Sequence, residues 1–297
     1  MILQETFSLA NGVSIPKLGF GTWMIPNDQV ARAVQDAVAV GYRHIDTAQA
    51  YANESGVGAG LRGCGVPRKE LFVTTKLAAE CKRYEEAKRL IDGSLQALGL
   101  DHIDLMIIHS PQPWSQFRSG EHFFEGNLEA WQALEEAYRA GKLRAIGVSN
   151  FEREDLDNII DNGSVAPMVD QILAHVGNTP FDLIEYIQSK GILVEAYSPV
   201  AHGEILKNDE LGALAAKYGV SIAQLCIRYC LQLGMLPLPK SVNPSHMRSN
   251  AAVDFGISAT DMTTLMNVAP FDDYGQATMF PVFGRKRPGV SPRDSRR

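Results

Sequence analysis

Short apolar runs alternate along the chain with segments in which hydrophobic residues recur at helical spacing. The apolar runs, rich in β-branched and aliphatic residues, predict strands over residues 18–22, 44–46, 71–75, 104–109, 145–149, 167–171, 193–197 and 235–239. The segments between them predict helices over residues 28–40, 53–63, 84–98, 128–140, 153–160, 182–190 and 245–253, with two more inside 209–233. The pattern therefore predicts a repeated strand–helix unit.

Strands that alternate with helices indicate an α/β protein with a parallel sheet, because each parallel strand needs a crossover connection. Eight such units are the number that closes a (β/α)8 TIM barrel. The competing fold is an open, doubly wound sheet, which typically carries G-x-G-x-x-G after its first strand. Only Gly19 and Gly21 occur there, without a third glycine. We therefore expect the barrel.

The two ends of the chain differ from the repeat. Residues 7–10 and 13–15 flank Asn11-Gly12, a dipeptide typical of hairpin turns, and predict an N-terminal β-hairpin placed to plug the lower mouth of the barrel. No Gly/Ser linker interrupts the chain, so we expect one domain over residues 1–284. Residues 285–297 carry six Lys or Arg and one Asp, which predicts a basic, flexible tail.

Composition narrows the class of protein. The chain is 45% hydrophobic and 21% charged, which is typical of globular proteins, and its apolar runs are too short to cross a membrane. The N-terminus has no basic segment followed by a sustained apolar stretch, so we expect a cytoplasmic protein. The net charge of −6 is the sum of +5 on the tail and −11 on the remainder. An acidic body offers no basic surface for binding nucleic acid. We expect a monomer without nucleic-acid or membrane partners.

The four cysteines do not form a recognisable framework. Cys64, Cys81, Cys226 and Cys230 match neither a disulfide pattern nor a C-x-x-C metal motif. Cys226 and Cys230 stand four residues apart in an apolar helical segment, which places them on one helix face. We expect free thiols and no zinc site.

Four titratable residues fall at the ends of three successive predicted strands. Asp46 ends the second strand, Tyr51 follows it, Lys76 follows the third and His109 ends the fourth. Catalytic groups of barrel enzymes gather at these carboxyl ends. A nearby ammonium lowers the pKa of a phenol, a carboxylate orients the ammonium, and a neutral imidazole orients a carbonyl oxygen. Each residue alone has a structural interpretation, but together they predict a proton-donating site.

The region around Asp46 resembles the signature of a known family. Residues 41–48 read Gly-Tyr-Arg-His-Ile-Asp-Thr-Ala and are followed by Tyr51, Asn53, Glu54 and Gly58. This stretch is similar to the signature of the aldo-keto reductases, and further matches extend to about residue 255.

The resemblance implies a reaction and a division of roles. Tyr51 would be the general acid, Asp46 and Lys76 would tune it, and His109 would position a carbonyl substrate while a reduced nicotinamide delivers hydride. Family members that reduce conjugated C=C bonds carry glutamate in the place of His109. The resemblance therefore implies reduction of an aldehyde or ketone to an alcohol.

The resemblance also implies a nicotinamide-nucleotide site. Ser149, Asn150 and Gln171 would bind the carboxamide and Tyr197 would stack on the nicotinamide ring, while the following loop would cover the pyrophosphate. Lys240 and its neighbours would meet the adenosine end. The full set of cofactor-binding residues is Thr22, Asp46, Ser149, Asn150, Gln171, Tyr197, Ser198, Pro199, Val200, Gly203, Lys240, Ser241, Val242, His246 and Asn250, and the substrate-binding set is Trp23, Tyr51, His109 and Trp114 with walls from residues 271–283.

Several positions depart from the family pattern. His246 stands where the family has an arginine, and an imidazole makes at most one charge-assisted bond to phosphate where guanidinium makes two. We therefore expect NADPH as the cofactor, with NADH also accepted. Leu173 and Val176 replace Glu and Pro after the sixth strand, and Ser110 replaces Trp after His109.

Two alternative functions compete with carbonyl reduction. A metal-dependent barrel hydrolase would use His44-x-Asp46, but it needs three or more ligands, and the later strand ends offer Ser149, Gln171 and Tyr197. A nicotinamide-binding regulatory protein would keep the cofactor site with little turnover. The intact set of four titratable residues favours the enzyme.

Overall fold

The computed structural model describes residues 1–271 and 273–284, and the predicted basic tail over residues 285–297 lies outside this part. Its main sheet contains eight parallel strands in the order of the sequence. They are β3 (Gly19–Gly21), β4 (His44–Asp46), β5 (Phe72–Leu77), β6 (Ile103–Ile108), β7 (Leu143–Ser149), β8 (Val169–Leu173), β9 (Leu193–Tyr197) and β10 (Leu236–Leu238). The Gly21 N–H donates to the Pro239 carbonyl over 3.0 Å and joins the first strand to the last. The predicted (β/α)8 barrel is confirmed.

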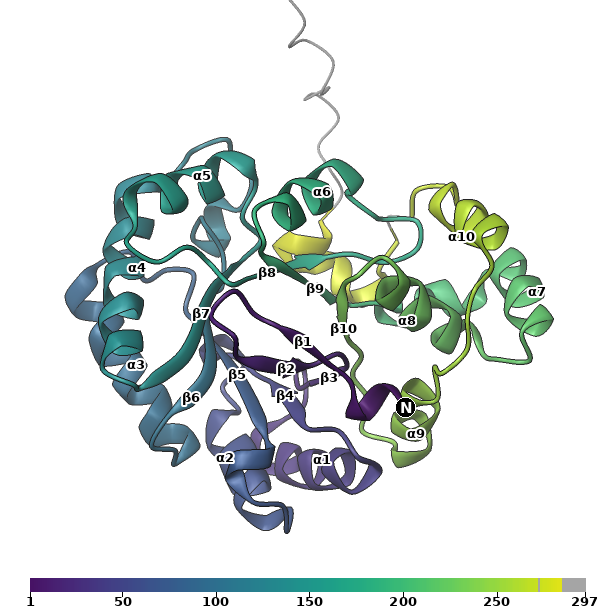
Figure 1. Cartoon of the computed structure of the whole chain (residues 1–297), viewed down its shortest axis with the longest axis horizontal. Helices are drawn as coiled ribbons and strands as arrows, with labels where there is room; N and C mark the ends of the chain where they lie inside the picture. Colours follow the sequence, from purple (N-terminus) through teal and green to yellow (C-terminus); the bar gives the residue numbers. More distant parts are fainter. Residues whose placement is uncertain (272, 285–297) are drawn as a thin grey trace, which may run out of the picture.

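Helices surround the barrel on its outside (Figure 1). They are α1 (Asn27–Val40), α2 (Glu54–Gly63), α3 (Tyr84–Leu98), α4 (Phe124–Arg139), α5 (Arg153–Asn162), α6 (Phe181–Ser189), α7 (Asp209–Lys217), α8 (Ile222–Gln232), α9 (Pro244–Ala251) and α10 (Ala259–Met266). The predicted helices are all present, and α10 is an element that the sequence analysis missed. Part of the reason is that this short helix buries only Asp261, Met262 and Leu265, which is a weak apolar pattern.

Local sequence fixes several helix ends. Helix α3 ends at Gly99, whose left-handed backbone (φ +66°) is one that glycine adopts without strain. Helix α8 begins with a capping box in which the Ser221 side chain accepts from the Gln224 N–H and the Gln224 side chain accepts from the Ser221 N–H. These caps satisfy backbone groups that would otherwise lack partners at the helix ends.

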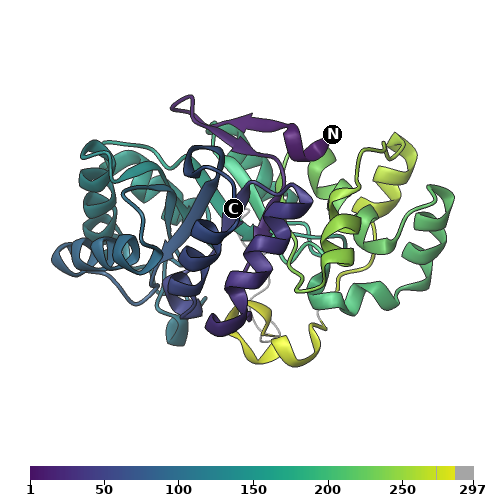
Figure 2. The same cartoon turned by 90° about the horizontal axis from the view of Figure 1, so that it is seen from below.

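The N-terminal hairpin closes one end of the barrel. Strands β1 (Thr6–Ser8) and β2 (Ser14–Pro16) pair antiparallel, and the Leu9 N–H donates to the Val13 carbonyl across the loop. The strands are thus shorter, and the loop longer, than Asn11-Gly12 alone indicated. The Asn11 amide donates to the Arg144 carbonyl near the start of β7, which ties the hairpin to the amino ends of the barrel strands. The hairpin and the described residues 271 and 273–284, which we call the C-terminal segment, lie at opposite ends of the barrel (Figure 2).

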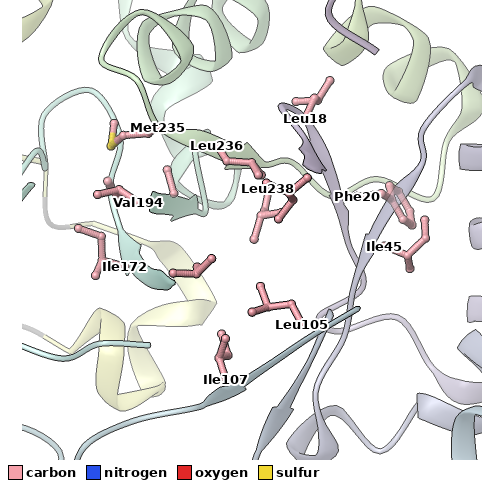
Figure 3. Packing of buried hydrophobic residues seen from close by; sticks show 14 of the residues in the cluster. Leu18, Phe20, Ile45, Leu105, Ile107, Ile172, Val194, Met235, Leu236 and Leu238 are labelled. Atoms are coloured by element: carbon pink, nitrogen blue, oxygen red, sulfur yellow. The ribbon is translucent and has the colours of Figure 1, made fainter. Parts of the chain in front are cut away.

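The barrel interior is filled by side chains. Leu105 and Ile107 of β6 and Leu236 and Leu238 of β10 project into the same interior space (Figure 3). They form the apolar part of the packing that is typical of such barrels. Polar side chains of β4, β5, β8 and β9 occupy the rest of the interior. This polar part lies nearer to the carboxyl ends of the strands.

Two further expectations concern the chain as a whole. All four cysteines are free, as predicted. Among the helices of the described residues, none combines the length and the apolar character that crossing a membrane requires.

Candidate active site

A cavity of about 890 Å³ is lined by residues at the carboxyl ends of the strands, whereas the hairpin is tied to the amino ends. Its walls come from the strand ends, from the loop after β9 and from the C-terminal segment. The predicted site residues that line it are Trp23, Asp46, Tyr51, His109, Trp114, Ser149, Asn150, Gln171, Tyr197, Ser198, Pro199, Val200, Gly203, Lys240, Ser241, His246 and Asn250. The structure therefore brings almost the whole predicted set to one cavity.

Three predicted residues lie outside the cavity wall. Lys76 is completely buried beneath it. Thr22 is also fully buried, and its hydroxyl donates to the Asp46 carbonyl over 2.9 Å, so it supports a wall residue from behind. The Val242 side chain is 55% exposed and does not line the cavity, because the chain turns it toward solvent before α9 begins.

Lys76 and Asp46 form a buried ion pair under Tyr51. The Lys76 Nζ donates to Asp46 Oδ1 over 2.6 Å and to the Thr47 carbonyl over 2.9 Å. The same Nζ lies 5.0 Å from the centre of the Tyr51 ring. Neighbouring parallel strands β4 and β5 carry the pair, and Tyr51 ends the short 3-10 turn Gln49–Tyr51 that follows β4. The ammonium is thus fixed between a carboxylate and a phenol.

Burial decides the protonation of these groups. It raises the pKa of the Tyr51 phenol above its usual range, and the Lys76 charge counteracts this only in part. The expectation that the Lys76 charge lowers the pKa of Tyr51 is therefore outweighed by the larger effect of burial. Burial also disfavours the charged form of Lys76, but Asp46 and Tyr51 outweigh it and raise the pKa of the ammonium. At neutral pH the phenol keeps its proton and the lysine stays charged.

His109 lies beside Tyr51 on the cavity wall. The two ring centroids are 5.7 Å apart, and the Trp114 ring packs edge-on against the imidazole at 4.9 Å. Burial, with a contribution from Lys76, lowers the pKa of His109 well below its usual range. The imidazole is therefore neutral at physiological pH, which suits a group that orients an uncharged oxygen atom.

Asn150 and its neighbours form a connected corner of the cavity. The Asn150 amide donates to the His109 carbonyl over 3.0 Å and accepts from the Tyr197 hydroxyl over 2.7 Å. The Ser149 hydroxyl donates to the Gln171 carbonyl over 2.7 Å. Asn150 has a left-handed backbone (φ +62°), a conformation that asparagine tolerates better than most residues. These bonds fix Asn150, Tyr197 and Ser149 against one another.

The loop after β9 has an irregular backbone. Ser198 and His202 both have positive φ angles, and the 3-10 segment Ala201–Lys207 is kinked at His202 and Gly203. The His202 ring packs against Trp23 at 5.1 Å and against Phe283 at 4.4 Å. His202 is a wall residue that was not predicted, because nothing in a loop pattern shows which aromatic partners will surround a residue.

The C-terminal segment is anchored to the loop after β8. His175 contacts the Val176 carbonyl through Nδ1 over 2.7 Å and the Tyr274 hydroxyl through Nε2 over 3.0 Å. The Phe271 N–H donates to the Gly177 carbonyl over 2.8 Å. The buried Val176, one of the departures from the family pattern, therefore belongs to the contact that positions this wall.

Lys240 and the start of α9 form the far end of the cavity. Lys240 lines the cavity and is exposed, and in the described part of the chain no carboxylate forms an ion pair with it. His246 is exposed there, and Asn250 is largely buried. The Asn243 side chain caps α9 by accepting from the Ser245 N–H over 2.9 Å. A cation without an internal partner suits an anionic group of a ligand.

The metal-site interpretation finds no support among residues 1–271 and 273–284, where no three His, Cys, Asp or Glu side chains are grouped to hold a metal ion. The His44 Nε2 lies 2.9 Å from the Thr74 hydroxyl and 4.0 Å from Glu195. Glu195 is a functional candidate that the sequence analysis missed. The available sign was a charged residue inside a strand predicted to be buried.

Comparisons with known proteins show the family to which the chain belongs. The model of the Aldo/keto reductase family matches residues 17–269. The glyoxal reductase of Bacillus subtilis (strain 168) is 38% identical over 262 residues, covering 88% of this chain and 91% of the relative. A crystal structure of an aldo/keto reductase from Brucella melitensis has a TM-score of 0.82 with 36% identity and covers 88% of this chain and 98% of the other.

A second solved structure carries a cofactor. The aldo-keto reductase of Bombyx mori in complex with NADP has a TM-score of 0.79 and 34% identity, covering 88% of this chain and 92% of the other. The family model matches most of the chain, and the fold is a closed barrel with a buried Lys76–Asp46 pair beneath Tyr51. These observations assign the family. The chain belongs to the aldo/keto reductase family of carbonyl-reducing oxidoreductases.

Proposed function

We propose that this chain reduces an aldehyde or ketone to an alcohol with Tyr51 as the general acid. The observation that carries the proposal is the protonated Tyr51 phenol above the buried Lys76–Asp46 pair, with the neutral His109 beside it. These groups meet on one wall of a cavity large enough for a substrate. Together they can hold a carbonyl oxygen and deliver a proton to it.

Each of the four residues has a separate task. His109 orients the substrate oxygen toward the phenol, and Tyr51 gives its proton to that oxygen as negative charge develops there. Lys76 stabilises the phenolate that remains, and Asp46 keeps the ammonium in place. A bound reduced nicotinamide supplies the hydride that the carbonyl carbon accepts. Proton exchange with solvent then restores the phenol.

The cavity fits a nicotinamide nucleotide along its length. Ser149, Asn150 and Gln171 offer polar atoms at one end, where the carboxamide would bind, and Tyr197 offers a ring for stacking. The irregular loop at Ser198, Pro199, Val200 and Gly203 would cover the pyrophosphate. Lys240, Ser241 and Asn250 would hold the adenosine end. The NADP complex of a structural relative supports this assignment.

We assign NADPH as the favoured cofactor, with NADH also accepted. The Lys240 ammonium supplies one charge for the 2′-phosphate. His246 lies at the same end of the cavity but lacks the paired donors of a guanidinium. The charged contact favours NADPH, and the missing guanidinium keeps the preference moderate.

The substrate is a small carbonyl compound held between aromatic walls. Trp23 and Trp114 line the cavity with Phe280 and Phe283 of the C-terminal segment. A monomer as the active unit stays a prediction. The single domain over residues 1–284 and the cytoplasmic location stay predictions.

The decisive experiment follows NADPH and NADH oxidation by absorbance against a panel of aldehydes, ketones, keto acids and sugars. We expect turnover of aldehydes with both nucleotides and lower KM values for NADPH. Tight nucleotide binding without turnover of any carbonyl compound would support the regulatory alternative and overturn the proposal.

A further inference from the structure

The barrel interior below the cavity contains a carboxyl group that the proposed chemistry does not use. Glu195 of β9 has no solvent exposure, and its Oε2 accepts from the Gln171 amide over 2.7 Å. Its Oε1 has no hydrogen-bond partner in the described part of the chain and lies 4.0 Å from His44 Nε2. Burying such a group costs stability, and the interior of a barrel is usually filled by branched aliphatic side chains.

Glu195 and Asp46 together determine which way the Gln171 amide points. The Gln171 Nε2 donates to Asp46 Oδ2 over 3.0 Å and to Glu195 Oε2 over 2.7 Å. Asp46 is held by Lys76 as a carboxylate, which only accepts hydrogen bonds, so the amide end between the two acids must be the amino group. Gln171 lines the cavity, and among the described residues no donor reaches its Oε1. Gln171 therefore offers an acceptor oxygen to a ligand.

We propose that Glu195 is a positioning residue that holds the Gln171 amide with its oxygen toward the N–H of the cofactor's carboxamide. The inference rests on the proposed assignment of Gln171 to that carboxamide. Asp46 alone favours the amino group at this end, but the terminal torsion of a glutamine is broad, so a second acceptor at the same end narrows the orientations that the amide adopts. Without Glu195, the Gln171 oxygen would be held less firmly toward the N–H of the carboxamide.

The surroundings of Glu195 make the interaction compatible with the charge of Asp46. Burial and the neighbouring Asp46 raise the pKa of Glu195 to about 8, so the carboxyl group is neutral at physiological pH. Burial lowers the pKa of the facing His44 to about 3, so that ring is neutral as well. Lys76 is the remaining charged group in this network, and it is paired with Asp46. A neutral glutamine in place of Glu195 offers an equivalent carbonyl acceptor.

The test compares two nucleotides by calorimetric titration of the full chain. NADP⁺ has a carboxamide, whereas its 3-acetylpyridine analogue has a methyl ketone that donates no hydrogen bond. We expect Glu195→Met to raise the Kd of NADP⁺ roughly tenfold, which is the value of one hydrogen bond, and to change that of the analogue by less than about twofold. Glu195→Gln should keep the wild-type Kd for both nucleotides.

Matched variants separate the possible failures. Thr74→Val removes a hydroxyl from the same barrel interior without touching Gln171, and it should change neither Kd. Gln171→Leu should reduce the preference for NADP⁺ over the analogue, with Ser149 and Asn150 retaining the rest. If that preference is unchanged in Gln171→Leu, the assignment of Gln171 to the carboxamide fails.

Suppose that Gln171→Leu behaves as expected, but Glu195→Met raises the Kd of both nucleotides equally or changes neither Kd. The role of Glu195 is then overturned, and the assignment of Gln171 stands. Thermal unfolding shows whether each variant is folded. Glu195→Val is the second variant should Glu195→Met not fold, because branched aliphatic side chains are those that barrels of this type accommodate.

Discussion

The Lys76 ammonium donates to the Asp46 carboxylate over 2.6 Å at a position where solvent does not reach the lysine at all. Removing one partner of such a pair destabilises the folded protein, because the other charge is then left unpaired in a medium of low polarity. The pair also fixes the ammonium 5.0 Å from the centre of the Tyr51 ring. Stability and proton transfer are therefore coupled through the same two residues.

Replacing Tyr51 by phenylalanine should reduce kcat by roughly 10² to 10⁴ while the nucleotide Kd stays unchanged, because the phenol is needed only when the carbonyl oxygen takes its proton. Steady-state kinetics and calorimetric titration with NADP⁺ measure the two effects separately. A variant that retains most of the wild-type kcat would remove Tyr51 from the role of general acid.

Replacing Lys76 by methionine should lower kcat strongly and reduce the free energy of unfolding by about 3 to 5 kcal/mol, since Asp46 is left without its partner. Urea unfolding and the pH profile of kcat are the measurements. The double variant Lys76→Met/Asp46→Asn removes both charges and should regain part of the stability but none of the activity. A shifted pH optimum with full activity would make the lysine only a helper.

An enone ketone should be reduced to the allylic alcohol. The neutral His109 orients the carbonyl oxygen, whereas the family members that reduce C=C bonds carry glutamate at this position. Product analysis by chromatography distinguishes the two outcomes. A saturated ketone as the main product would contradict the role proposed for His109.

Replacing His246 by arginine should lower the KM for NADPH roughly tenfold or more and leave the KM for NADH nearly unchanged, because a guanidinium adds a charge-assisted contact that only the 2′-phosphate receives. Arg248→Ala serves as a control for the general effect of charge in α9. Equal changes for both nucleotides, or none, would show that His246 does not face the 2′ position.

The pH dependence of stability should reveal the buried Glu195. Its folded pKa of about 8 lies above the value of 4.5 for an ordinary glutamate, so the folded protein holds a proton that the unfolded chain releases. Stability is thus complete below the lower value and is lost as pH rises through the folded pKa, by at most about 1.4 kcal/mol per pH unit. Urea unfolding between about pH 5 and pH 8 should show this loss in the wild type and not in Glu195→Gln. If the stability of the wild type and of Glu195→Gln changed with pH in parallel, the pKa of Glu195 would not lie near 8.

Local patterns carried the prediction of the fold. The helix Tyr84–Leu98 and the strands His44–Asp46 and Leu193–Tyr197 have the predicted bounds, because the periodicity of their apolar positions and their end signals are properties of consecutive residues. Strand β8 is displaced by two residues from the prediction, since the residues on either side of it are similarly apolar. Nothing in one strand's sequence states where its neighbour will begin to pair.

The chemistry of the site was predicted only as a set of residues at strand ends. The order of strands along the chain sufficed to place Asp46, Tyr51, Lys76 and His109 at the same end of a barrel. The contact between Asp46 and Gln171 joins residues 125 positions apart, and the pKa of Tyr51 is raised by a burial that only the folded chain creates. Periodicity is a property of neighbours in sequence, whereas desolvation and pairing depend on neighbours in space, and only the tertiary structure supplies those.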